Sequence, residues 1–161
     1  MPLHETTNIY TEEHGIISLA EVAGTTVHVP FSSSPEERYR HIIRWQEAKI
    51  ELDPRPLACH QITVEDPEGI RHTIIAGDGQ VFWALEDPSF KWMPYTAKEL
   101  KLGSLMPGAH PTDNDHIKNF TIISITRMWH THQCYKLWTA DYNTYILANN
   151  LSIFCDGVWN R

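Results

Sequence analysis

The sequence predicts an all-β protein, on three observations. Short runs rich in Val, Ile, Thr and aromatic residues recur along most of the 161-residue chain. Gly, Asn, Asp and Pro separate these runs, as expected of turns. Only one stretch has the start signals and spacing of a helix of several turns. Because the length is that of one ordinary domain, we expect residues 1–161 to form a single domain, with a segment of uncertain structure inserted at about 32–56.

The predicted strands come mostly in pairs joined by short turns. Segments 7–11 and 16–21 flank a turn in which Gly15 takes a backbone conformation with positive φ. Segments 59–64 and 71–75 flank a five-residue hairpin loop. Five further strands are predicted, at 25–29, 80–85, 119–127, 134–139 and 144–148.

One segment departs from the β pattern. Ser34 can cap a helix and Pro35 suits its first position, with two Glu in the first turn. Tyr39, Ile42 and Ile43 follow at helical spacing, which predicts a helix over 35–49. A second, single helical turn is predicted at 96–100, and the Pro- and Asp-rich stretch 107–115 is predicted to be a loop.

Charge and cysteine content exclude several classes. The net charge is −7 and no Lys/Arg cluster exceeds a pair, which argues against nucleic-acid binding. No apolar run is long enough to cross a membrane, and the polar start lacks a signal peptide. Three widely spaced cysteines form neither a disulfide framework nor a structural zinc motif. We therefore expect a cytoplasmic protein without a cofactor.

Four segments match, in order, the sequence blocks of a known family. They are residues 2–29 (PLHETTNIYTEEHGIISLAEVAGTTVHV), 75–82 (IAGDGQVF), 92–106 (WMPYTAKELKLGSLM) and 134–157 (CYKLWTADYNTYILANNLSIFCDG). Together they resemble the Hint family, which includes inteins and hedgehog autoprocessing domains. The resemblance implies a flattened β horseshoe in which the chain ends meet, here with one short helical insertion. It also implies a minimal member without the inserted endonuclease, from a phage or other mobile element.

The resemblance further implies self-splicing chemistry, for which this chain lacks the groups. Family members use an N-terminal Cys or Ser as nucleophile, a Thr and His pair that activates the scissile amide, a second His and a closing His–Asn pair. The matching positions here are Pro2, Ala76, Gly79, Asn143, Phe154 and Cys155, whereas Asp141 is retained. We therefore predict that splicing is lost and that the protein is a protein-binding or structural module rather than an enzyme.

Three alternatives stay open. The first is a residual autoprocessing domain that cleaves its own chain near Cys155 and Asp156, where the bond before Gly157 is also prone to succinimide formation. The second is a metal site, because on a flat strand His130, His132 and Cys134 would share one face. A solvated hairpin tip is the competing interpretation of these three residues. The third concerns the partner surface, for which the best candidates are Trp129 and Trp159.

Overall fold

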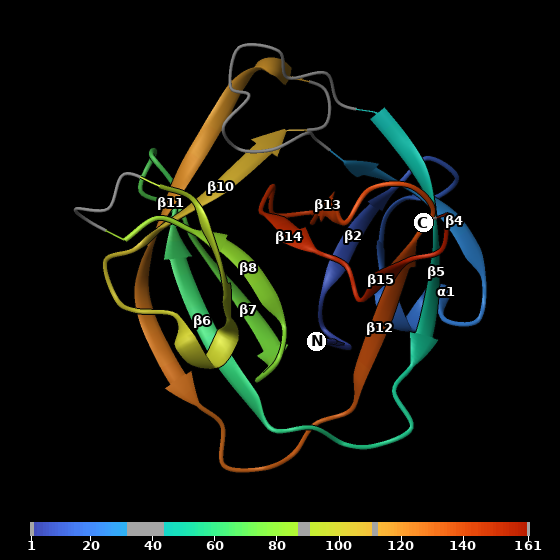
Figure 1. Ribbon diagram of the computed structural model, residues 1–161, viewed down its shortest axis with the longest axis horizontal. Helices are drawn as coiled ribbons and strands as arrows, with labels where there is room; N and C mark the ends of the chain where they lie inside the picture. Colours follow the sequence, from blue (N-terminus) through green and yellow to red (C-terminus); the bar gives the residue numbers. More distant parts are fainter. Residues whose placement is uncertain (1, 32–43, 87–90, 111–112, 161) are drawn as a thin grey trace.

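The computed structural model describes residues 2–31, 44–86, 91–110 and 113–160, and most of these lie in β-strands (Figure 1). The strands of the first half are β1 (Leu3–His4), β2 (Asn8–Thr11), β3 (Gly15–Ser18), β4 (Thr26–Phe31), β5 (Arg44–Leu52), β6 (Cys59–Glu65) and β7 (Arg71–Gly77). Those of the second half are β8 (Val81–Ala84), β9 (Met93–Thr96), β10 (Leu105–His110), β11 (Asp113–Arg127), β12 (Cys134–Thr139), β13 (Thr144–Ile146), β14 (Ser152–Phe154) and β15 (Gly157–Val158). The predicted all-β class is confirmed.

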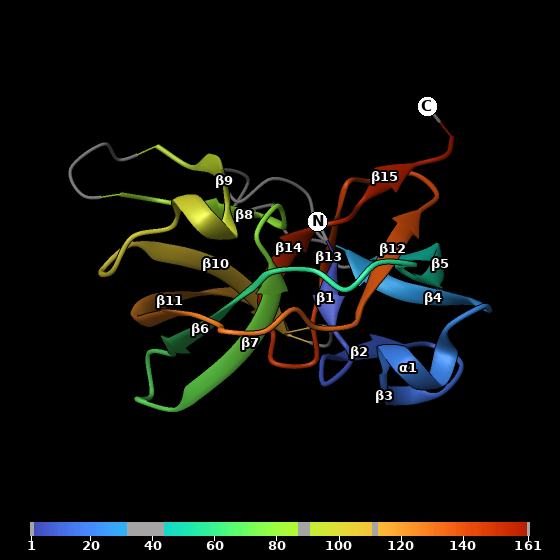
Figure 2. The ribbon, with the colours of Figure 1, turned by 90° about the horizontal axis from the view of Figure 1, so that it is seen from below.

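One large sheet unites the two halves of the chain. Its strand order is β10-β11-β6-β7-β1-β12-β5-β4, and β15 also pairs with β12. The short strand β1 is the link, because Leu3 lies opposite both Ala76 in β7 and Tyr135 in β12. Figure 1 shows β6, β7, β10 and β11 on one side and β4, β5 and β12 on the other, with the N-terminus between them. Figure 2 shows that the molecule is flattened.

Two smaller sheets cover this frame. Strands β13, β14, β8 and β9 form a four-stranded sheet, and β2 and β3 form a hairpin. Apolar side chains from all three sheets make one core, in which Leu3, Ile9, Phe82, Phe120 and Tyr145 are at most 2% exposed. Burial of this apolar area is the main force that holds the short strands together.

Several local predictions are confirmed. The β2–β3 turn contains Gly15 with φ of +67°, a conformation that glycine adopts without steric cost. The helical turn predicted at 96–100 is a 3₁₀ turn, η1 (Ala97–Glu99). The Glu99 carboxylate accepts hydrogen bonds from the Thr96 amide at 3.0 Å and from its hydroxyl at 2.8 Å, which caps the turn.

The helix predicted over 35–49 is wrong where the structure describes it. Residues 44–49 belong to β5, which pairs with both β4 and β12 and is therefore part of the large sheet, not of an insertion. Its buried residues are Gln46, Ala48 and Ile50, at the period of two that a strand requires. The proposed cap and the helical positions Tyr39, Ile42 and Ile43 lie outside the described residues.

Two boundaries also differ from the prediction. The strand predicted at 16–21 ends at Ser18, whose hydroxyl caps the short helix α1 (Leu19–Val22) by accepting from the Glu21 amide at 3.4 Å. The loop predicted at 107–115 is instead largely a hairpin, since β10 reaches His110 and β11 begins at Asp113. Among the described residues, no helix is long and apolar enough to pass through a membrane.

Candidate functional site

The two ends of the chain meet along one edge of β12. The opposite edge of β12 is covered by β5. On the free edge, β1 pairs with Cys134 and Tyr135, and β15 pairs with Trp138 and Thr139. The first and last strands therefore follow one another along the same strand. This meeting point is where chemistry that joins or cuts the chain ends would take place.

At the first chain end, the residue beside Pro2 is Gly77. The Gly77 amide donates to the Pro2 carbonyl at 2.9 Å, and a Cβ on Gly77 would lie 3.2 Å from that oxygen. The predicted positions Ala76 and Gly79 lie elsewhere: Ala76 is fully buried opposite Leu3, and Gly79 is exposed. No side chain at 76, 77 or 79 could therefore activate the Pro2 carbonyl.

Gln80 links the two chain ends, and we did not single it out from the sequence. Its side chain is 1% exposed, and its Nε2 donates to the Phe154 carbonyl at 2.8 Å and to the Val81 carbonyl at 3.1 Å. Moving the family's T-x-x-H pattern one residue along the chain would match Gly77 and Gln80 to its Thr and His. The signal in the sequence was a lone Gln beside a β-rich run. A primary amide can orient a carbonyl but does not exchange protons near neutral pH.

The retained Asp141 belongs to a turn that Gln46 holds in place. Gln46 is 3% exposed; its Oε1 accepts from the Tyr142 amide at 2.9 Å, and its Nε2 donates to the Thr144 carbonyl at 3.0 Å. The Asp141 carboxylate is exposed and accepts from Asn160 Nδ2 at 2.8 Å. Asn143 contributes its backbone, since its carbonyl accepts from the Cys155 amide at 2.8 Å. This turn therefore supports the closing segment through main-chain contacts.

Cys155 carries the strongest nucleophile among the described residues of the meeting point. Its thiol is 7% exposed, lies 3.1 Å from the Thr139 hydroxyl oxygen and donates to the Gly157 carbonyl at 3.3 Å. Burial raises the pKa of the Cys155 thiol. Because the thiolate is the reactive form, this environment keeps the sulfur unreactive near neutral pH.

The neighbours of Cys155 differ from each other in chemistry. Phe154, in the predicted position of a His, packs against Trp83 with ring centroids 4.9 Å apart. Asp156 is half-buried, and its Oδ2 accepts from the Leu137 amide at 2.7 Å. Burial raises the pKa of Asp156 to about 6. Asp156 is thus the one group of the closing segment that titrates close to neutral pH.

The proposed metal ligands do not converge. His130 is exposed, His132 is half-buried and Cys134 is fully buried, with its sulfur 3.6 Å from that of Cys59. Within the described ranges there is no group of three or more His, Cys, Asp or Glu side chains that could hold a metal ion. Three residues spaced along a flat strand would have converged, but β12 begins only at Cys134, so the two His precede the strand.

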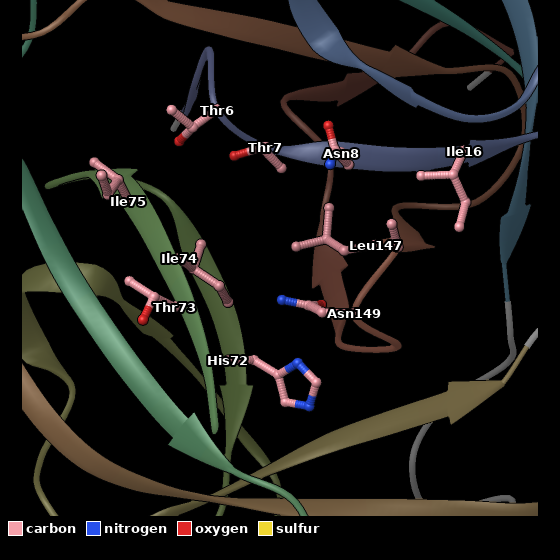
Figure 3. A pocket seen from close by; sticks show the side chains of 11 residues that line it. Thr6, Thr7, Asn8, Ile16, His72, Thr73, Ile74, Ile75, Leu147 and Asn149 are labelled. Atoms are coloured by element: carbon pink, nitrogen blue, oxygen red, sulfur yellow. The ribbon is translucent and has the colours of Figure 1, made fainter. Parts of the chain in front are cut away.

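Two cavities lie outside the meeting point. One, of about 390 Å³, is lined by residues of β2, β3, β7 and the segment after β13; Figure 3 shows the side chains that line it. The other, of about 430 Å³, is lined by Trp45, Glu47, Asp141 and Trp159, among others. Of the two Trp residues expected at a partner surface, Trp129 is 98% exposed and Trp159 is 36% exposed beside this second cavity.

Solved structures of inteins share the architecture of this chain. The Ssp DnaB mini-intein variant M86 is 14% identical, with a TM-score of 0.72 over 96% of this chain and 93% of its own. The DnaB intein from Synechocystis sp. PCC 6803 is 13% identical, with a TM-score of 0.72 over 96% and 98%. A bacterial intein-like domain from Clostridium thermocellum is 13% identical, with a TM-score of 0.56 over 96% and 99%.

Sequence comparison adds nothing to this likeness, since no protein-family model and no curated protein matches the chain. The structural likeness extends over nearly the whole chain and agrees with the resemblance of the four sequence blocks. The chain therefore has the Hint fold of the inteins.

Proposed function

We propose that this protein keeps the Hint fold without self-splicing and acts by binding another protein. The observation that carries the proposal is the environment of Cys155, whose buried thiol has a raised pKa and donates to a backbone carbonyl. Pro2 lacks a nucleophile, and Gln80 and Phe154 stand where an imidazole would be needed to move protons. The meeting point is thus built of groups that hold the chain ends together.

A protein partner is favoured over the other classes of ligand. The net charge of −7 disfavours nucleic acid, and the most exposed large apolar side chain among the described residues is Trp129. Exposed aromatic side chains commonly anchor protein–protein contacts. The binding part of the proposal is developed in the next subsection, because it requires a defined surface.

The loss of splicing is tested by intact mass. The protein is fused between two folded tags and followed for a day with and without a thiol reductant, with Cys155→Ser as the matched variant. We expect the mass of the fusion to stay unchanged in both. A spliced tag–tag product, or release of a tag that Cys155→Ser abolishes, would overturn the proposal.

A second candidate function is cleavage of the chain near Cys155 and Asp156. Two features favour it: the raised pKa of Asp156, which leaves part of the carboxyl protonated near pH 6, and the Gly157 that follows. The same fusion separates the candidates when it is incubated at pH 5, 6 and 7. A C-terminal tag released at Asp156, and retained in Asp156→Asn, would establish the second candidate and exclude the first.

A further inference from the structure

We infer that the outer edge of β7 and the cavity beside it accept an extended peptide of a partner protein as an additional strand. The inference rests on the proposed binding function and names its surface. We call this surface the β7 groove, formed by Thr73, Ile74 and Ile75 on one side and by Thr7, Asn8 and Asn149 on the other.

The edge of β7 is paired over only part of its length. On one side β6 pairs with β7 from Arg71 to Gly77 without a break in register. On the other side β1 reaches only Ala76, and no other described strand pairs with β7. The Gly77 amide points to this second side, toward Pro2. Because main-chain groups alternate in an antiparallel strand, those of Thr73 point the same way, into the groove.

The opposite wall of the groove is fixed by hydrogen bonds. The Ala148 amide donates to the Asn8 carbonyl at 3.0 Å, and Leu147 forms a bridge with Ile9. The wall therefore cannot close onto β7 without breaking this pairing. Figure 3 shows β7 with Thr73, Ile74 and Ile75 facing Thr7, Asn8 and Asn149 across the cavity. The cavity of about 390 Å³ is within the range of pockets that bind ligands.

The walls indicate which peptide would fit. Hydroxyl and amide side chains alternate with the buried apolar surfaces of Ile74 and Leu147. The titratable side chain in the lining, His72, has its Nε2 3.1 Å from the Asp66 carboxylate and its ring against Phe120. With this ion pair formed internally, the groove presents backbone donors and acceptors and small neutral pockets. That is the chemistry of strand addition, in which the peptide main chain supplies the affinity.

The test begins with a displayed library of random heptapeptides, selected on the intact protein. Selected peptides are synthesised with a fluorophore, and their binding is measured by anisotropy. Thr73→Pro removes the outward amide of β7 without touching the bonds to β6, and proline is tolerated on such a strand edge. We expect it to weaken binding about three- to tenfold for each hydrogen bond lost, while Thr73→Val binds like the wild type. Salt should have little effect, since no net charge lines the groove.

A second measurement leaves the protein unchanged, in case Thr73→Pro does not fold. Each amide of a selected peptide is methylated in turn, which removes one donor at a time. Binding should fall at every second position, because only alternate amides of an added strand face β7. Loss at consecutive positions, or at none, would overturn the inference.

The remaining outcomes are equally decisive. Peptides that bind Thr73→Pro as tightly as the wild type, or a selection that yields no peptide above background, would overturn the β7 groove. The fusion experiment above is independent: release of a tag would overturn the proposed function whether or not peptides bind. Selected peptides that bind elsewhere would remove the groove and leave a binding function in place.

Discussion

At the scale of single residues, the buried polar side chains of this protein bond to backbone. Gln46 and Gln80 each bridge segments far apart in the sequence, and Asp156 accepts from the Leu137 amide. A buried amide that satisfies several main-chain groups rigidifies the turn it contacts. The chain ends are thus held by single polar side chains as well as by the core.

Asp156 should make the stability depend on pH. Burial raises its pKa from the ordinary value of 3.8 to about 6, so the folded protein binds this proton more tightly than the unfolded chain does. Its stabilising effect is complete below about pH 4 and is lost as the pH rises through 6. Asp156→Asn keeps an acceptor for the Leu137 amide but removes the charge. Between pH 4 and 7.5 we expect the wild type to lose on the order of 2 kcal/mol of unfolding free energy relative to this variant.

Denaturant unfolding of both proteins across that pH range measures the difference. Lys136 and Asp53 lie close enough to influence Asp156, but they are common to the two proteins and cancel. Asp141→Asn, at an exposed carboxylate of the neighbouring turn, is the matched control and should run parallel to the wild type. Parallel curves for Asp156→Asn would contradict the assignment.

The residues of the meeting point were only partly predictable. The four blocks located the segments that come together, and Pro2, Phe154 and Cys155 lie in them. Which side chain crosses from one segment to another depends on register and burial. For that reason Gly77 and Gln80, one residue beyond the predicted Ala76 and Gly79, became visible only in three dimensions.

At the scale of elements, β5 shows why a strand was mistaken for a helix. A capping signal preceded it, and its inward positions are Gln46, Ala48 and Ile50. A polar Gln at an inward position breaks the apolar alternation that identifies a strand. The contacts that make Gln46 suitable there come from the Tyr142–Thr144 turn, about a hundred residues away, which no local pattern can reveal.

Strand β10 was mistaken for a loop because Gly108 has a packing role. A Cβ at this position would lie 2.2 Å from the Phe120 ring and 2.6 Å from the Asn150 carbonyl. Gly108→Ala should therefore push β10 away from β11 and from the turn at Asn150, at a cost of about 1–3 kcal/mol or more. Thermal unfolding measures the loss, with Thr126→Ala at an exposed position of β11 as control. A melting temperature equal to the wild type would show that the turn moves freely.

Strands β6 and β12 bring two cysteines together. The sulfurs of Cys59 and Cys134 are 3.6 Å apart and both residues are fully buried. Incubation with glutathione disulfide should slowly join them, the two thiol hydrogens passing to two molecules of glutathione. The reaction is slow because burial raises the pKa of Cys134. The cross-link, 75 residues apart, would stabilise the fold by up to about 4 kcal/mol.

Thiol labelling under denaturing conditions follows this reaction. The number of free thiols should fall from three to one in the wild type, whereas Cys59→Ser should keep its two. A glutathione adduct on Cys134 in place of the internal bond would show that the two strands do not approach closely enough.

At the scale of the whole molecule, β1 holds the two sides of the large sheet together. Leu3 is 1% exposed and faces both β7 and β12. Leu3→Ala should cost about 2–5 kcal/mol, and hydrogen exchange should accelerate together in β7 and β12. The control is Leu52→Ala, at a side chain 45% exposed in β5. Faster exchange confined to one of the two strands would mean that the sides unfold separately.

The position of β1 also sets an order of events during synthesis. Leu3 and His4 leave the ribosome first, yet β7 is complete only at residue 77 and β12 only at residue 139. For most of translation the apolar Leu3 has no strand to cover it and is exposed to chaperones. A chain that stops before β12 lacks the strand that joins β1 to β5, so a truncated product contains no smaller version of this fold.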